Sequence, residues 1–198
     1  IDVDVIIDFS NAQAVDGLLD YAVASKTPVV LCTTGLSEEQ LDKVEAASKH
    51  VAVLRSANMS IGINVILKLL KEAVSRFAPE GFDVEIVEKH HNQKLDAPSG
   101  TAIALADAMN EEMNGMYEYV YDRSQVRKKR GKKELGISAI RGGNIVGEHD
   151  VIFAGTDEVI TISHSAHSKA IFAKGAIAAA KYLAGRTPGL YDMSDVMA

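Results

Sequence analysis

In the first part of the chain, the spacing of apolar residues alternates between the pattern of a buried strand and the pattern of a helix. Nearly continuous apolar runs predict buried strands at residues 3–9, 28–32 and 51–55. Between these runs, apolar positions recur at helical spacing and predict helices at residues 11–25 and about 37–49. Ser37 and Gln40 have the spacing of a capping box at the start of the second helix. Strands that alternate with helices are typical of a parallel sheet with helices on its faces.

The pattern changes after residue 59. Ser60 is predicted to cap a long helix that runs through residue 78, and a further helix is predicted at residues 100–113. Apolar and polar residues alternate with a period of two and predict strands at residues 84–90, 117–121, 136–141, 146–154 and 159–164. This order indicates an α+β region with a mixed or antiparallel sheet. A last helix at residues 169–185 is expected to return to the first sheet and to be followed by a loop.

Composition limits the class of protein. The 198 residues are 47% hydrophobic, which is enough for one large domain or two small ones with true cores. The sequence contains no apolar run that could span a bilayer and no positively charged leader, so no membrane partner is expected. A single cysteine, Cys32, favours a cytoplasmic location and a buried structural thiol. The formal net charge of -6 argues against a nucleic-acid partner but allows a small anion in a local basic pocket.

Candidate chemistry is concentrated in EKHHNQKLDAPSGTA, residues 88–102. A predicted strand ends there at His90 and His91, and a predicted helix begins at Gly100 and Thr101. The N–H groups in the first turn of a helix favour a carboxylate or a phosphate, and Lys94 adds a positive charge. Histidine can donate a proton near neutral pH, so either histidine is a candidate general acid. The segment is therefore predicted to bind a small dianion beside its own proton donor.

Simpler interpretations compete with this one. A Ser-Gly-Thr helix start can be only a cap, and adjacent histidines on a strand point to opposite faces. That geometry disfavours a shared metal ion, so no metal site is predicted. The basic run at residues 127–133 is interpreted as a solvated hairpin loop, with an anion or an acidic partner as the alternative. Glu85 and Glu88 alternate with apolar residues, so no catalytic role is expected of them. His164 and His167 are expected to have packing or capping roles.

Residues 90–102, HHNQKLDAPSGTA, resemble the H-H-x-x-K-x-D-A-P-S-G-T-A signature of the 4-hydroxy-tetrahydrodipicolinate reductase family, also called dihydrodipicolinate reductases. The resemblance continues through IIDFS, TTG, SANMSIGIN, RGGNIVGEHDVIF and GLYDMSDV and covers essentially the whole chain. It implies an α/β fold in which a truncated Rossmann-like parallel sheet, residues 1–59 with 169–198, binds NADH or NADPH. It further implies an α+β domain with a mixed sheet, residues 60–168, that binds substrate and builds a homotetramer.

The resemblance also implies a reaction, the reduction of a cyclic imine dicarboxylate in lysine and diaminopimelate biosynthesis. His90 matches the family's proton donor and acceptor, and Lys94 matches its second proposed donor. His91, Gly100 and Thr101 match the family's substrate contacts. The implied cofactor contacts lie where the first three predicted strands end and are Phe9, Ser10, Thr33, Thr34, Ser56, Ala57, Asn58 and Met59.

One expected feature of a dinucleotide site is missing from the sequence. No G-x-G-x-x-G turn occurs, and RGGNIVG has glycines at a different spacing. The family's opening strand and the residues that select NADH or NADPH have no counterpart either. The chain is therefore expected to be truncated at its N-terminus, and its cofactor preference stays open. The alternative to a reductase is a truncated fragment that binds substrate and oligomerises without competent cofactor binding.

Overall fold

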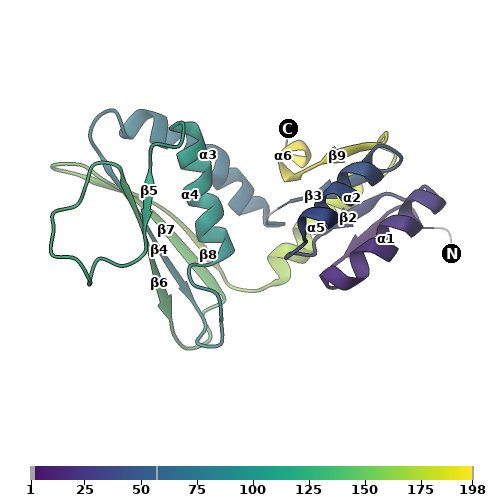
Figure 1. The fold of residues 1–198 in the computed structure, drawn as a ribbon, viewed down its shortest axis with the longest axis horizontal. Helices are drawn as coiled ribbons and strands as arrows, with labels where there is room; N and C mark the ends of the chain where they lie inside the picture. Colours follow the sequence, from purple (N-terminus) through teal and green to yellow (C-terminus); the bar gives the residue numbers. More distant parts are fainter. Residues whose placement is uncertain (1–2, 57, 198) are drawn as a thin grey trace. The chain divides into compact units, whose positions relative to one another are not determined.

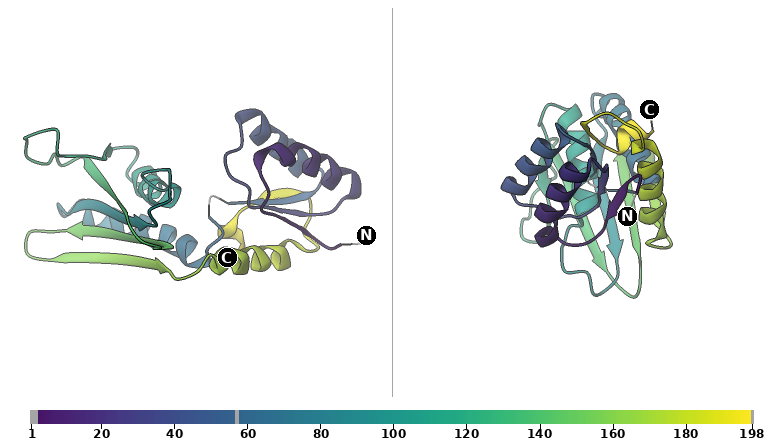
Figure 2. Two further views of the ribbon diagram at one scale, coloured as in Figure 1. Left: turned by 90° about the horizontal axis from the view of Figure 1, so that it is seen from below. Right: turned by 90° about the vertical axis from the view of Figure 1, so that its right-hand side faces the viewer.

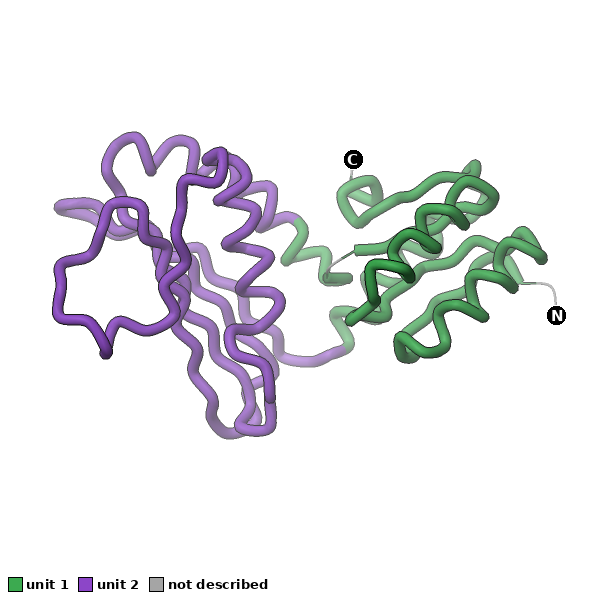
Figure 3. The backbone as a smooth tube through the Cα atoms, in the orientation of Figure 1, with its two compact units in different colours: residues 1–64, 170–198 green, residues 65–169 purple. Residues whose placement is uncertain are grey.

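The computed structural model describes residues 3–56 and 58–197. The chain forms two compact units (Figure 1 and Figure 3). Unit 1 comprises residues 1–64 and 170–198, and unit 2 comprises residues 65–169. The division falls inside α3 (Ile61–Phe77). Among the described residues, no helix is long and apolar enough to cross a membrane.

Unit 1 is built on a parallel sheet with the strand order β1-β2-β3-β9 over the described residues. The strands are β1 (Ile6–Asp8), β2 (Val29–Leu31), β3 (Ala52–Arg55) and β9 (Gly189–Tyr191). Its other helices are α1 (Ala12–Ser25), α2 (Glu38–Ser48), α5 (Ala170–Leu183) and α6 (Met193–Val196). The predicted capping box is confirmed, because Ser37 Oγ accepts from Gln40 N and Gln40 Oε1 accepts from Ser37 N. The parallel sheet of the predicted α/β class is also confirmed.

Helices cover both faces of this sheet. Val29, Leu31 and Val53 pack against α1 and α2, whereas Val30 and Leu54 pack against α5 and α6. The left view of Figure 2 shows α1 and α2 on one side of the sheet and the yellow-green α5 on the other. All side chains of β2 are fully buried, which is why this strand reads as a continuous apolar run rather than an alternating one.

The predicted loop at the C-terminal end is wrong. Residues 189–191 form β9, which pairs in parallel with β3, and α6 follows with a capping box between Asp192 and Asp195. A strand of three residues is too short to show a period, so hydrophobic patterning gives no signal for β9. The sheet is therefore one strand wider than the pattern predicts.

Unit 2 contains a mixed sheet with the order β5-β6-β4-β7-β8 among the described residues, as expected from the strand pattern. The strands are β4 (Asp83–His90), β5 (Glu118–Val120), β6 (Glu134–Arg141), β7 (Gly147–Ala154) and β8 (Val159–Ala166). β6 runs parallel to β5 and β4, and β7 runs antiparallel to β4 and β8.

One face of this sheet carries the core of unit 2. Leu70 and Val74 of α3, and Leu105 and Met109 of α4 (Gly100–Glu112), pack against apolar residues of the inner strands: Val84, Ile86, Leu135, Ile137, Val151 and Phe153. The opposite face carries the more exposed members of the strands, including Ile140, which is 47% exposed, and Val159, which is 63% exposed. The core of unit 2 therefore lies on the helix-covered face of the sheet.

Candidate active site

The helix-covered face of the unit 2 sheet is apolar along most of its length and polar at one end. Along β4, Val84 and Ile86 are buried in the core, and the next residues on the same face, Glu88 and His90, are buried as well. Glu88 lies opposite His149 of β7, and His149 lies opposite His164 of β8. The rings of His90 and His149 meet edge to face with centroids 5.2 Å apart. Strand register therefore gathers one carboxylate and three imidazoles.

Glu88 is the fully buried centre of this group. Its Oε1 accepts from Arg141 Nη2 at 2.7 Å and from Ser99 N at 3.0 Å. Its Oε2 accepts from Arg141 Nη1 at 2.8 Å and lies 2.6 Å from His90 Nδ1. Burial raises the pKa of Glu88, but hydrogen bonds from Arg141, His90 and Ser99 outweigh that effect and hold the pKa below its usual value. Glu88 is therefore an ionised carboxylate.

The loop after β4 leads directly into the N-terminus of α4. Ser99 caps this helix, because its Oγ accepts from Ala102 N at 3.1 Å, and the same Oγ lies 3.0 Å from His149 Nε2. Gly100 is exposed at the first helical position, and a Cβ built there would meet no protein atom within 4 Å. The first turn of α4 thus begins beside the histidine cluster, where a helix dipole favours an anion.

Lys94 is held within this loop by its neighbour. Its Nζ lies 2.8 Å from Asp96 Oδ1, and this hydrogen bond is the main reason why the pKa of Asp96 is lowered. The backbone oxygen of Asp96 also accepts from Arg141 Nη2 at 2.7 Å, so the loop is tied to the buried carboxylate through one guanidinium. His91 and Thr101 are both partly buried in the same segment. The predicted residues of the segment thus surround the end of β4 and the start of α4.

Glu88, Arg141 and His149 belong to the site, but the sequence pattern alone does not identify them. Alternation treats Glu88 like Glu85, whereas Glu85 lies on the other face of β4 and pairs with Arg123. The period of two does carry a signal, because it places Glu88 on the same side as Ile86 and His90. Hydrophobic patterning gives no comparable signal for Arg141 and His149, since their positions depend on how β6 and β7 pair with β4.

His149 makes the unfolding free energy depend on pH. Burial, followed by the charge on His90, lowers the pKa of His149 from 6.5 to about 4, so the unfolded chain binds a proton that the folded chain does not. The unfolding free energy should therefore fall by about 2 kcal/mol between about pH 7 and pH 5 from this residue. Urea unfolding at pH 7 and at pH 5 should show a smaller drop in the unfolding free energy for His149→Gln than for the wild-type protein. His50→Gln, at an exposed position, is the control. An equal drop in His149→Gln and His50→Gln would contradict this account.

The predicted cofactor contacts lie at the carboxyl ends of the parallel strands of unit 1, where ligands bind in open α/β sheets. Phe9, Ser10 and Thr34 are exposed there. Thr33 is buried, and its hydroxyl donates to Asp8 Oδ2 at 2.6 Å. The exposed aromatic ring and polar side chains fit a nucleotide through stacking and hydrogen bonds, whereas Thr33 fits a role in shaping the loop.

The loop after β3 is organised by its own polar groups. Ser56 Oγ donates to the backbone oxygen of Asn58 at 3.2 Å, and Asn58 Oδ1 accepts from Ser60 N at 2.8 Å. Met59 is buried against α5, so its side chain belongs to the core of unit 1. Ala57, also a predicted contact, lies outside the described residues. Ser56 and the backbone are the groups of this loop that fit a polar ligand.

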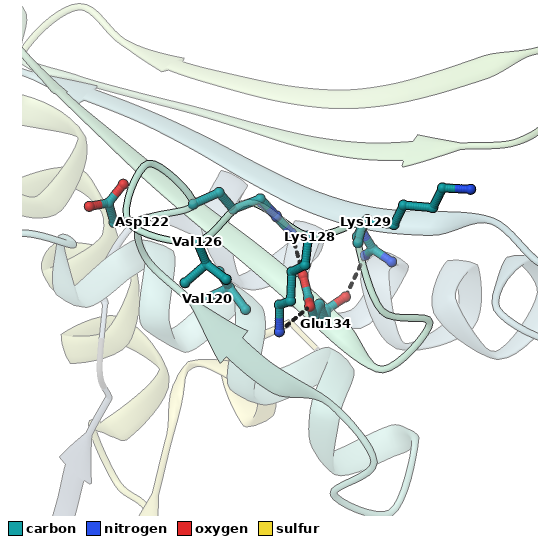
Figure 4. A pocket seen from close by; sticks show the side chains of 8 residues that line it. Val120, Asp122, Val126, Lys128, Lys129 and Glu134 are labelled. Carbon is teal, nitrogen blue, oxygen red and sulfur yellow. Dashed lines mark hydrogen bonds and ion pairs between the residues drawn. The ribbon is translucent and has the colours of Figure 1, made fainter.

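The basic run at residues 127–133 lines a pocket of about 100 Å³ next to β5 and β6 (Figure 4). Lys128 Nζ lies 3.4 Å from Glu134 Oε1, and Arg130 Nη1 lies 2.7 Å from Asp83 Oδ1. Lys128 and Arg130 are thus paired with carboxylates of their own sheet. The hairpin interpretation of the run is wrong, because the strands on either side of it are parallel.

Comparison with known proteins identifies the family. The family description "Dihydrodipicolinate reductase, N-terminus" matches residues 1–59, and "Dihydrodipicolinate reductase, C-terminus" matches residues 62–197. The chain belongs to the dihydrodipicolinate reductase family. One reductase of this family, 4-hydroxy-tetrahydrodipicolinate reductase from Caldanaerobacter subterraneus subsp. tengcongensis, is 58% identical over 98% of this chain and 76% of its own length. The 4-hydroxy-tetrahydrodipicolinate reductase from Clostridium novyi is 52% identical over 100% of this chain and 77% of its own length.

Solved structures agree with the fold of a dihydrodipicolinate reductase. A dipicolinate-bound dihydrodipicolinate reductase from Paenisporosarcina sp. TG-14 is similar with a TM-score of 0.76 and 23% identity, over 96% of this chain and 71% of that one. A probable dehydrogenase from Thermotoga maritima is similar with a TM-score of 0.56 and 13% identity, over 98% of this chain and 74% of that one. At these identities the likeness supports the two-part architecture alone.

Proposed function

We propose that this protein is a 4-hydroxy-tetrahydrodipicolinate reductase that uses NADH or NADPH to form tetrahydrodipicolinate in lysine and diaminopimelate biosynthesis. The observation that carries the proposal is the buried Glu88–His90 pair beside the exposed N-terminus of α4, in a chain of this family. Relatives of that name, 58% and 52% identical over nearly all of the chain, support an oxidoreductase over a fragment without cofactor binding.

The two units would have the separate binding functions that the family resemblance implies. Residues 1–59 with 169–198 would bind the nucleotide, and residues 60–168 would bind the substrate and assemble the oligomer. When bound, the nucleotide supplies the hydride for the reduction. The side chains of Phe9, Ser10, Thr34 and Ser56 are exposed or half-buried and would contact it, and the loop residues Thr33, Asn58 and Met59 would shape its site.

His90 would supply the proton that the substrate carbon needs once the neighbouring position has been reduced. Lys94 is the second donor in this proposal, and its ammonium would also stabilise negative charge on the substrate. The two carboxylates of the substrate would be held by His91 and by the N–H groups and hydroxyl at Gly100 and Thr101. The pairing of Lys94 with Asp96 at 2.8 Å means that substrate must compete for this ammonium.

The direct test is an assay of the purified chain with 4-hydroxy-tetrahydrodipicolinate generated in situ. The reaction is monitored as the loss of NADH or NADPH absorbance. Other cyclic imines and keto acids serve as comparison substrates. Dipicolinate, which a solved relative binds, should inhibit competitively. Oxidation of the nucleotide with keto acids but not with the proposed substrate would reject the assignment.

Gly100→Ala should separate ligand binding from folding. The helical position has room for a methyl group, and alanine is favoured over glycine in helices, so the unfolding free energy should stay equal or rise by up to about 1 kcal/mol. The same methyl group would stand in the way of a carboxylate at the helix N-terminus, and we expect roughly tenfold weaker binding of dipicolinate by calorimetry. Unchanged affinity for dipicolinate would show that its carboxylate does not bind next to Gly100.

A homotetramer in the cytoplasm completes the proposal. The family to which the chain belongs is the basis for proposing a tetramer. Cys32, with a pKa raised to about 12 by burial and by Asp8, is a protonated thiol and suits a reducing compartment. Light scattering of the purified protein measures the assembly directly, and a monomer at assay concentration would reject the tetramer.

A further inference from the structure

Apart from His90, the groups that face the two oxygens of Glu88 can only donate hydrogen bonds. Oε1 faces the backbone N–H of Ser99 and one arm of the Arg141 guanidinium, and Oε2 faces the other arm. The remaining neighbour is His90 Nδ1, 2.6 Å from Oε2. An ionised carboxylate has no proton to give, so the proton in this short contact belongs to Nδ1.

The opposite ring nitrogen of His90 lies over a glycine. A Cβ built on Gly147 of β7 would stand 3.1 Å from His90 Nε2, which is closer than side chains normally approach. Glycine at this position leaves that nitrogen uncrowded by the neighbouring strand. The ring is thus anchored through Nδ1, and Nε2 is the nitrogen left to exchange a proton.

We propose that Glu88 is a positioning residue that keeps the proton of neutral His90 on Nδ1, so that Nε2 accepts and donates the proton used in the reaction. This inference rests on the proposed role of His90 as the acid. In the protonated ring both nitrogens carry hydrogen, and Nε2–H is the bond that breaks when the proton passes to the substrate carbon. The neutral ring that remains keeps Nδ1–H bonded to the carboxylate. Glu88 itself neither gains nor loses a proton.

Arg141 has a distinct part in this arrangement. A fully buried carboxylate would tend to become protonated, and a protonated Glu88 could donate to Nδ1 and reverse the ring's tautomer. The bidentate guanidinium at 2.7 and 2.8 Å favours the ionised form. It also fixes both carboxylate oxygens in space, which sets the direction of the bond to His90.

The test is the tautomer of His90, read from imidazole ¹⁵N shifts in mildly alkaline solution, where an ordinary imidazole is neutral. The signal of His90 is identified by its loss in His90→Gln. The wild-type protein should show the proton on Nδ1. In Glu88→Gln the amide oxygen should take the Oε1 position, where Ser99 N–H and Arg141 Nη2 both donate. The amide NH₂ at the Oε2 position should then displace Arg141 Nη1 and face Nδ1, the one neighbour that can become an acceptor. The proton should therefore move to Nε2.

Kinetics supply the second readout. Glu88→Gln should lower kcat roughly 10²-fold, as expected for an acid with its proton on the wrong nitrogen, while dipicolinate affinity changes less than about threefold. Glu85→Gln is the matched control, because it removes an arginine-bound carboxylate from the other face of the same strand and should change neither readout. A wild-type proton on Nε2, or an unchanged kcat with a shifted tautomer, would overturn the inference.

The tautomer measurement keeps the inference separate from the proposed function. It needs no substrate, so a protein that shows the expected shift but reduces no cyclic imine would confirm that Glu88 sets the tautomer of His90 and would reject the reductase. If Glu88→Gln does not fold, the wild-type tautomer still decides the matter, because Nδ1–H is required there.

Discussion

Replacing His90 with glutamine should lower kcat by roughly 10²- to 10⁴-fold, the range lost when a general acid is removed. Glutamine has a similar size and can donate its amide N–H to Glu88, so the buried carboxylate keeps a partner and the protein should fold. An amide cannot release a proton at neutral pH. Because Lys94 and the α4 N-terminus stay in place, dipicolinate affinity should change only slightly.

His91→Gln is the informative companion variant, since it removes the adjacent histidine just beyond the end of β4. It should raise KM and weaken dipicolinate binding, with a smaller effect on kcat, because His91 is a proposed substrate contact. Stopped-flow or steady-state assays with NADH and NADPH distinguish the two patterns. If His91→Gln has the large kcat effect and His90→Gln does not, the proton donor is His91 and the Glu88–His90 pair is structural.

The elements of this fold that follow from local rules could be predicted from the sequence. Ser37 with Gln40 fixes the start of α2, and the unbroken apolar run at 28–32 identifies a strand buried on both faces. β9 could not be predicted in this way, because its three residues acquire strand structure only by pairing with β3. Short elements depend on partners that are distant in the sequence.

The candidate site likewise contains one part that follows from local sequence and another that depends on distant strand pairing. The signature at residues 90–102 places a histidine, a lysine and a helix N-terminus in one local segment, so its chemistry could be predicted from sequence. The carboxylate that orients His90 depends on Arg141, which reaches it because β6 runs parallel to β4 and aligns Arg141 with His90. The sheet order β5-β6-β4-β7-β8 is not sequential, and local patterning contains no information on it.

Gly175→Ala should strongly destabilise unit 1. A Cβ at this position would lie 1.7 Å from the backbone oxygen of Met59 and 2.8 Å from its backbone carbon. Backbone atoms cannot turn aside as a side chain can, so either α5 or the loop after β3 must move. Overpacking of this kind costs about 3 kcal/mol or more when the neighbour is rigid. Circular dichroism during urea unfolding measures the loss, and weaker NADH and NADPH binding should accompany it.

Gly17→Ala provides the matched control for this prediction. Gly17 also lies inside a helix, α1, but a Cβ there would meet no atom within 4 Å. Alanine at an exposed helical position stabilises by up to about 1 kcal/mol relative to glycine, so the two variants should change the unfolding free energy in opposite directions. Helix propensity alone would make both substitutions favourable, and only the crossing of α5 over the Met59 backbone makes Gly175 different. If both variants are stabilised, that close crossing does not exist in solution.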